Sequence, residues 1–210
     1  MRPPRMRVAL FGRSSAGINL AGEMARAGHE IVEISNPAEL SSFEALIIAV
    51  GDARLDAAVE LLEPHVHRGL IAVHTCLSRG VQVLDPLETR GCVVAALAPI
   101  VSGRWAATTL DELGETIVEL IAGEFHADVL ALSDAERAPF AARVYYADML
   151  HRLQVPAARE AEFFAPTEEW PPVGSDFDSQ EAIAAYRGAT DPGLRRSYVE
   201  VARRLSLIHI

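Results

Sequence analysis

The stretch that most constrains this chain is residues 6–36, MRVALFGRSSAGINLAGEMARAGHEIVEISN. An apolar run from Val8 to Phe11 stops at Gly12, and a segment with helical spacing begins near Gly17 and ends at Gly28. The following residues, 30–34, have the composition of a second strand. We therefore expect a strand, a tight turn, a helix and a second strand in immediate succession.

The turn after the first strand carries Gly12, Ser14 and Gly17 at the spacing G-x-G-x-x-G, with serine in the middle position. Such a turn must reverse sharply, let a pyrophosphate approach its backbone, and direct unpaired helix amides at the charge. The pattern predicts a dinucleotide site, and an ordinary strand-to-helix turn is the structural alternative. The residues expected to hold the cofactor here are Gly12, Arg13, Ser14, Ser15, Ala16 and Gly17.

The end of the second strand should carry the acidic residue that binds an adenosine ribose, about 20 residues after the glycines. Here the strand ends in Ser35 and Asn36, and Glu33 is expected to point one step too early. Without a carboxylate nothing repels a 2'-phosphate, so the sequence favours NADP over NAD, with Arg13, Ser35 and Asn36 as phosphate contacts. A solvated Arg13 is the equal alternative.

Strands and helices continue to alternate after Asn36-Pro37, which predicts parallel pairing and ligands at the carboxyl ends of the strands. Val50, Gly51 and Asp52 follow the third strand and join the expected cofactor contacts, and Asp52 is also expected to cap the next helix. The fifth strand is expected to end at Ala98-Pro99. The further expected strands are 46–50, 70–73, 93–97 and 129–132.

Two later helices show capping signals. Thr109 with Glu112 is expected to start a helix whose inner stripe is Leu110, Leu113, Ile117, Leu120 and Ile121. Ser133 with Glu136 is expected to start a long helix that Pro139 kinks or restarts.

The predicted architecture is α/β: a Rossmann-like, doubly wound parallel sheet over 1–133 and a smaller, truncated helical domain over 134–204. Within the second domain, 165–178 is expected to form a loop or lid containing Trp170, and short helices to begin at Asp178 and Asp191. The last six residues, LSLIHI, match the in-frame translation of the transposon sequence CTGTCTCTTATACACATC. We therefore expect 205–210 to be a sequencing-adapter artefact and the natural chain to continue past Arg204.

Composition excludes several classes of function. The chain has 210 residues and a formal charge of −10, which argues against a nucleic-acid partner. All its basic residues other than histidine are arginine, so a P-loop and Schiff-base chemistry are excluded. It contains no apolar run near the roughly 20 residues of a membrane span and no signal-type core. Two cysteines are too few for a disulfide framework, so we expect a cytoplasmic protein.

The candidates for chemistry are few. His74 follows the fourth strand and is expected either to donate a proton or to be a hydrogen-bonded strand-end histidine. Tyr145, on the long helix beside Tyr146, is the second candidate donor. Cys76 lacks an evident activating base. His65 and His67 are two apart, but no further ligand stands at metal-site spacing, so no metal is expected.

Several segments together resemble a known family. They are Val8 to Gly17, Ala27 to Glu30, Ile48 to Asp52, His74-Thr75 and Leu84 to Leu87. The chain is similar over about residues 6–133 to Rossmann-like proteins of unknown function in the 6-phosphogluconate dehydrogenase-like superfamily, which includes pyrroline-carboxylate, ketopantoate and hydroxyacid reductases. The resemblance implies NAD(P) binding, a helical second domain and a homodimer. This sequence departs from it at Ala98-Pro99, where His-Pro is usual, and in lacking the lysine of the hydroxyacid branch.

Two functions follow as hypotheses. The first is an NAD(P)-dependent oxidoreductase that transfers hydride to a small carbonyl or imine substrate. The second is a non-catalytic dinucleotide-sensing or interaction module on the same fold, which the missing lysine and Ala98 favour.

Overall fold

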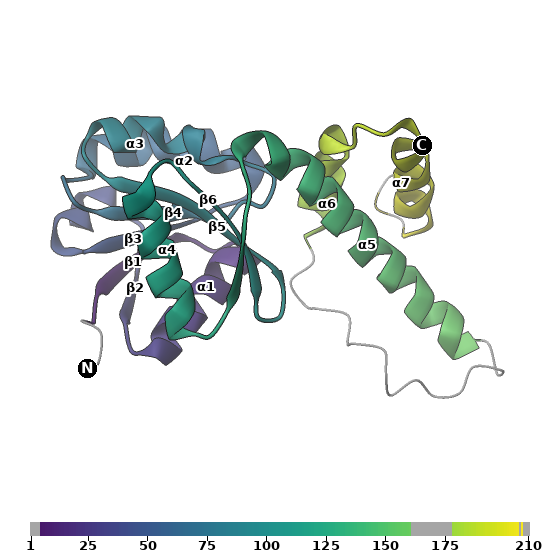
Figure 1. Ribbon diagram of the computed structural model, residues 1–210, viewed down its shortest axis with the longest axis horizontal. Helices are drawn as coiled ribbons and strands as arrows, with labels where there is room; N and C mark the ends of the chain where they lie inside the picture. The colour runs from purple at the N-terminus through teal and green to yellow at the C-terminus, as the bar shows by residue number, and fades with distance from the viewer. Residues whose placement is uncertain (1–4, 161–177, 206, 208–210) are drawn as a thin grey trace. The chain divides into compact units, whose positions relative to one another are not determined.

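A computed structural model describes residues 5–160, 178–205 and 207, and it divides the chain into two compact units, residues 1–137 and 138–210. Within the described residues, seven strands form one sheet in the order β2-β1-β3-β4-β5-β6-β7. The first five strands in sequence pair in parallel, β6 is antiparallel to β5, and β7 is parallel to β6 (Figure 1). Their bounds are β1 Arg7–Gly12, β2 Glu30–Ile34, β3 Ala45–Ala49, β4 Ile71–His74, β5 Val93–Val101, β6 Arg104–Thr109 and β7 Asp128–Ala131.

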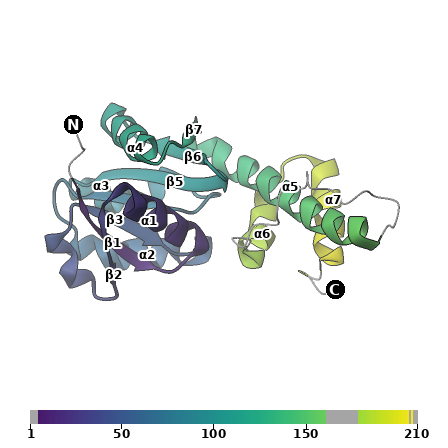
Figure 2. The ribbon, with the colours of Figure 1, turned by 90° about the horizontal axis from the view of Figure 1, so that it is seen from below.

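Helices cover both faces of this sheet (Figures 1 and 2). Strand β3 is buried along its whole length, as the continuous apolar run predicted. Alternate residues of β3 enter different cores: Leu46 and Ile48 pack with α2 and α3, whereas Ile47 packs with α1 and α4. The helices of the first unit are α1 Ser15–Ala27, α2 Leu55–Leu62, α3 Asp85–Thr89 and α4 Glu112–Glu124, and α5 Asp134–Glu160 begins in it. Short 3-10 helices are η1 Pro37–Ser42, η2 Asp52–Arg54, η3 Glu63–His65 and η4 Val81–Leu84.

The expected end of the fifth strand at Ala98-Pro99 is wrong. Strand β5 runs on to Val101, turns at Gly103 (φ 74°), and returns as β6, which pattern analysis missed. The ladder between the two strands changes register between Pro99 and Val101. A proline, which lacks an N–H, is tolerated at such an irregularity.

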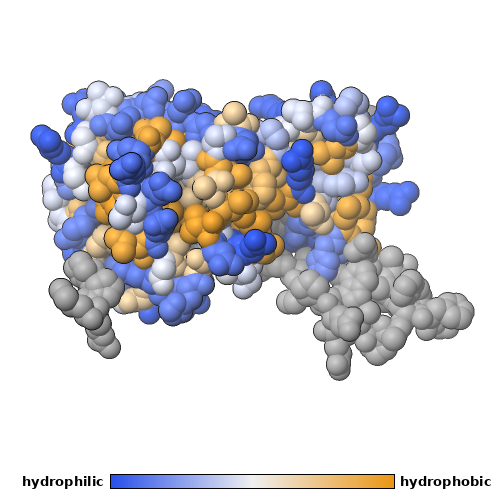
Figure 3. Space-filling view, viewed as in Figure 1, coloured by the Kyte–Doolittle hydropathy of each residue, from blue (hydrophilic) through white to orange (hydrophobic). Residues whose placement is uncertain are grey.

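The predicted start and inner stripe of α4 also need correction. Its N-cap is Asp111, whose carboxylate accepts a hydrogen bond from the Gly114 amide at 2.7 Å, rather than Thr109. The buried face is Gly114, Val118, Ile121 and Ala122. This face includes small residues, so a prediction based on large apolar residues assigned the wrong face of the helix to the core. Leu110, Leu113 and Leu120 are exposed instead. On the face of the molecule drawn in Figure 3, hydrophobic and hydrophilic areas lie side by side.

Helix α5 begins with the predicted capping box, since the Glu136 carboxylate accepts from both the amide (2.8 Å) and the hydroxyl (2.7 Å) of Ser133. The expected restart at Pro139 is wrong, because α5 is one continuous helix, and the expected kink stays a prediction. A proline in the second turn removes one hydrogen bond, the one to the Ala135 carbonyl, and the helix continues past it. The division between the two units falls within α5.

The second unit contains α6 Ser179–Ala185, the 3-10 turn η5 Tyr186–Gly188 and α7 Pro192–Arg204. Asp178 and Asp191 cap these helices as predicted. Its core packs Met149 of α5 against Tyr198 of α7, whose hydroxyl donates to the Ala182 carbonyl at 2.5 Å. The expected loop with Trp170 lies, apart from Asp178, outside the described residues.

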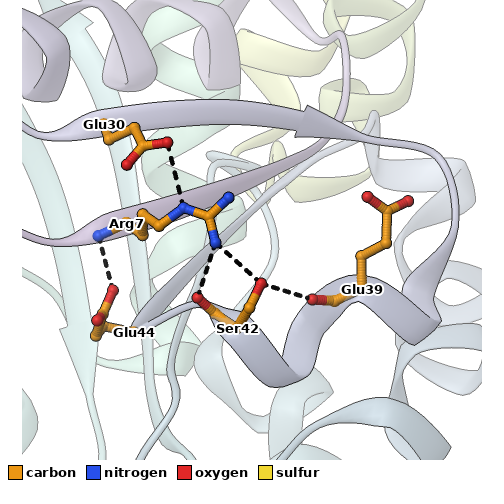
Figure 4. A network of polar contacts seen from close by, with 5 residues as sticks. All are labelled: Arg7, Glu30, Glu39, Ser42 and Glu44. Atoms are coloured by element: carbon orange, nitrogen blue, oxygen red, sulfur yellow. Dashed lines mark hydrogen bonds and ion pairs between the residues drawn. The ribbon is translucent and has the colours of Figure 1, made fainter.

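A polar network joins the strand ends opposite the carboxyl edge (Figure 4). The Arg7 guanidinium donates to Glu30 at 3.2 Å and to the hydroxyl of Ser42 at 3.1 Å. The Arg7 amide donates to Glu44 at 2.7 Å. These contacts hold the beginnings of β1 and β2 against η1. The candidate site lies at the opposite edge of the sheet, where the parallel strands end.

The identity of the α4 cap is testable. Replacing Asp111 with alanine should lower the free energy of unfolding of the first unit by about 1 kcal/mol, because the Gly114 amide loses its acceptor. Thr109→Ala, the cap expected from sequence, should cost less than half as much. The measurement is urea denaturation followed by Trp105 fluorescence in a Trp170→Phe background. A larger loss for Thr109→Ala would contradict the assignment.

Candidate functional site

The turn after β1 packs directly on the end of β3. Gly12 has a φ of +94°, and a Cβ there would lie 2.3 Å from the carbonyl oxygen of Ala49. A Cβ on Gly17 would lie 2.2 Å from the Ala49 Cβ. The Ser14 amide donates to the Ala49 carbonyl at 2.8 Å. Glycine is therefore required at both ends of the motif, one for the turn and one for close helix–strand packing.

Ser14, in the middle of the motif, is the N-cap of α1. Its hydroxyl accepts from the Gly17 amide at 3.2 Å and lies 3.5 Å from the hydroxyl of Thr75. The amides of Ser14 and Gly17 thus have acceptors within the protein. No acidic residue stands in this turn, so the positive end of the helix dipole is not offset by a carboxylate of its own.

Arg13 and Glu33 form an exposed two-point ion pair, with Nε and Nη2 of the arginine 2.5 and 2.8 Å from the carboxylate oxygens. The hydrogen bond from Arg13 lowers the pKa of Glu33, and the same bond raises the pKa of Arg13. The Glu33 carboxylate therefore reaches a residue of the turn, and whether it could meet an adenosine ribose stays a prediction. Ser35 and Asn36 are exposed beyond it, and the Asn36 side chain caps η1 through the Ala38 amide at 3.1 Å.

The residues after β3 pack beside the loop that follows β4. Val50 is buried and its carbonyl accepts from the Cys76 thiol at 3.2 Å, and Gly51 is the N-cap of η2. The expected capping by Asp52 is wrong, because its carboxylate oxygen Oδ2 instead accepts from the Ser78 hydroxyl. In the described part of the chain, its other oxygen, Oδ1, is buried without a hydrogen-bond partner.

His74 is fully buried at the end of β4. Its Nε2 donates to the Gly80 carbonyl at 3.0 Å, and its Nδ1 accepts from the Cys76 amide at 3.2 Å. Burial, and then the charge of Arg137, lower the pKa of this imidazole to about 3. The ring is therefore a neutral brace for the loop, which matches the structural alternative of the two interpretations.

Arg137, in the first turn of α5, is the residue that pattern analysis missed. It is fully buried, and its guanidinium donates to the Thr108 hydroxyl at 3.2 Å and to the Cys76 carbonyl at 2.9 Å. Burial lowers its pKa to about 10. No carboxylate in the described residues lies within ion-pair distance, and Nε has no acceptor there. Arginine is usually exposed, so nothing in the local pattern marks it.

Asp134 ties the same turn of α5 to the loop after β4. Its carboxylate accepts from the amides of Val81 (2.8 Å) and Gln82 (3.1 Å), and a Cβ on Gly80 would lie 2.2 Å from its carboxyl carbon. With Arg137 on the Cys76 carbonyl, both ends of the loop are anchored to α5.

The remaining candidates lie elsewhere. Tyr145 belongs to the second unit, where its hydroxyl donates to Glu181 at 2.6 Å. His67 contacts the Phe43 carbonyl through Nε2 at 3.0 Å, and His65 is exposed. Within the described ranges, no group of three metal-ligating side chains is present, and no helix there is long and apolar enough to cross a membrane.

The state of His74 can be checked by NMR. Its ring should remain the neutral Nε2–H tautomer from roughly pH 8 to 5, where an ordinary histidine titrates. Because the folded-state pKa lies below the ordinary 6.5, the unfolded chain binds the extra proton, so stability should fall as the pH drops from 6.5 toward 3. A His74 resonance that titrates between pH 6 and 7 would refute this assignment.

Comparisons with known proteins agree with this fold. Residues 36–99 match the family model of a Rossmann-like domain. No curated protein matches the sequence significantly. Among solved structures, 3-hydroxyisobutyrate dehydrogenase from Mycobacterium tuberculosis, in a structure with L-serine, is similar with a TM-score of 0.67, 9% identity, and coverage of 97% of this chain and 94% of that one.

Two further structures extend the similarity. Pyrroline carboxylate reductase from Plasmodium falciparum with NADP bound has a TM-score of 0.58 at 11% identity, covering 95% of this chain and 80% of that one. Arogenate dehydrogenase from Synechocystis has a TM-score of 0.56 at 13% identity, covering 95% and 84%. Residues 36–99 thus match a Rossmann-like domain, and the chain shares its fold with these two dehydrogenases and this reductase.

Proposed function

We propose that this protein binds a nicotinamide dinucleotide at the turn after β1 and transfers hydride between it and a small carbonyl or imine substrate. The observation that carries the proposal is the close packing of Gly12 and Gly17 on Ala49, which meets the first and third requirements of the dinucleotide motif. The fold-level similarity to dehydrogenases supports it, including one structure that holds NADP.

The residues present fit a pyrophosphate at the N-terminus of α1. The first turn contains no acidic residue, and a helix N-terminus offers amides and positive dipole to an anion. Ser14 replaces the glycine that would let the backbone approach most closely. Its hydroxyl caps the Gly17 amide. The serine thus hinders the approach of a phosphate to the backbone but stabilises the start of the helix.

The Arg13–Glu33 pair bears on the choice between NAD and NADP. A 2'-phosphate would compete with Glu33 for the guanidinium and would be repelled by that carboxylate, whereas a free ribose hydroxyl could donate to it. The sequence-based preference for NADP assumed that no carboxylate lies near this position, but the Glu33 carboxylate is paired with Arg13 there. We propose NADP or NAD as the cofactor, with this pair setting the ratio of their affinities.

The nicotinamide ring supplies or accepts the hydride, and the chain's own residues bind and orient it. His74 is buried and neutral, so it is not available to donate a proton. Tyr145 belongs to the second unit. We therefore assign neither residue a step in the reaction. A dinucleotide-binding module without catalysis is the second candidate. The buried, neutral His74 and the absence of lysine from the sequence favour it.

Phosphate binding at the turn is tested by Ser14→Asp. Aspartate caps a helix as well as serine does, so the fold should be retained, while its charge should repel a pyrophosphate. We expect NADP affinity, measured by calorimetry, to fall at least 10-fold. Thr116→Asp, which adds the same charge on the exposed surface of α4, should leave the affinity unchanged. Equal affinities for Ser14→Asp and the parent would exclude the turn as the phosphate site.

Catalysis is tested by mixing the full chain with NADPH and a panel of keto and imino acids in a stopped-flow spectrometer. Oxidation of NADPH above the buffer rate with any of them supports the reductase and rules out the purely binding role. If NADPH binds but no member of a broad panel is reduced, the module is the better description.

A further inference from the structure

The described residues contain two buried side-chain polar atoms without a hydrogen-bond partner, Asp52 Oδ1 and Arg137 Nε. Leaving such an atom unpaired is costly, and nearly all buried polar groups in folded proteins have a hydrogen-bond partner. One of the two accepts a hydrogen bond and the other donates one. A ligand group that both donates and accepts a hydrogen bond could therefore pair with the two atoms.

Both atoms belong to side chains that hold the same loop. Asp52 accepts from Ser78, and Arg137 donates to the Cys76 carbonyl. Because Cys76 and Ser78 are only two residues apart, these hydrogen bonds bring both side chains to the same short stretch of the loop. Burial lowers the pKa of Arg137, and the charges of Asp134 and, more weakly, of Asp52 raise it. Asp52 and Arg137 do not form an ion pair with each other in the described structure, although pairing would satisfy both at once.

The loop stands where the nicotinamide end of a dinucleotide should lie. It follows β4, and Thr75 at its start is 3.5 Å from Ser14 of the phosphate turn, hydroxyl to hydroxyl. Strand β4 is two places from β1 in the sheet, which is about 10 Å. A ribose and a nicotinamide ring can span such a distance from a pyrophosphate at the turn.

We propose that Asp52 and Arg137 bind the carboxamide of the nicotinamide ring. The amide N–H of the ligand donates to Asp52 Oδ1, and its carbonyl oxygen accepts from Arg137 Nε. A primary carboxamide offers both functions on one planar group, which neither a carboxylate nor an ammonium does. Both protein atoms are shielded from solvent, so entry requires a local shift, and residues 78–80 are the partly exposed part of this loop.

The inference rests on the proposed cofactor and would explain why an arginine is buried without a carboxylate partner. Fixing the carboxamide would set the rotation of the nicotinamide ring and hence the face that meets the substrate. A water molecule that bridges the two atoms is the competing explanation, since water also donates and accepts.

The test is equilibrium binding by calorimetry of NADP and of its 3-acetylpyridine analogue, which keeps the carbonyl but replaces the amide nitrogen by a methyl group. The parent chain should bind the analogue at least 10-fold more weakly, because a hydrogen bond to a charged acceptor is lost. In Asp52→Ala the two ligands should bind within about twofold of each other. Asp56→Ala, which removes the nearby carboxylate that pairs with Arg79 on the surface, should keep the parent ratio.

The outcomes separate this inference from the proposed function. If the parent binds both ligands equally, or if Asp52→Ala keeps the full discrimination, the carboxamide site is refuted while dinucleotide binding stands. If the parent binds neither ligand, the proposed cofactor fails as well. The comparison of the two ligands on the parent requires no variant, so it can refute the carboxamide site even if Asp52→Ala does not fold.

Discussion

The close approach of the β1 turn to Ala49 is the contact on which the candidate site depends. Two glycines face the same residue at distances that no side chain could occupy, and the Ser14 amide donates to its carbonyl. This packing brings the N-terminus of α1 to the carboxyl edge of the sheet, where its dipole and amides become a feature of the surface. Substitution at either glycine would disturb the backbone of β3 as well as the turn, so fold and ligand binding share one constraint.

A second set of contacts holds the loop after β4 and comes mainly from the first turn of α5. Asp134 accepts from the amides of η4, Arg137 donates to the Cys76 carbonyl, and His74 braces the loop from within. Both Asp134 and Arg137 lie in the first turn of α5, the helix that continues into the second unit. The charge of Arg137 is therefore buried beside the candidate site, and burying a charge without an ion-pair partner is costly.

Pattern analysis succeeded where local chemistry dominates. The strand–turn–helix at 7–27, the αL cap at Gly28 and the caps at Asp178 and Asp191 follow from residues close in sequence. It failed where a distant partner decides. Strand β6 is held by its neighbours β5 and β7 despite Pro99, and α4 turns its small residues inward because Gly114 packs on Thr109. The reach of Glu33 to Arg13 likewise depends on the register of β2 against β1.

The amino-acid sequence by itself determined that this chain forms an alternating α/β sheet with a glycine turn after its first strand, because hydrophobic period, capping residues and glycine conformation act over a few residues. It also excluded lysine chemistry, which is a matter of composition. Only the tertiary structure decided that His74 is buried and hydrogen-bonded within the loop after β4, and that Asp52 and Arg137 both bind this loop. The burial of His74 and the approach of Asp52 and Arg137, which are 85 positions apart, to one loop result from the packing of the chain. No local sequence pattern encodes such packing.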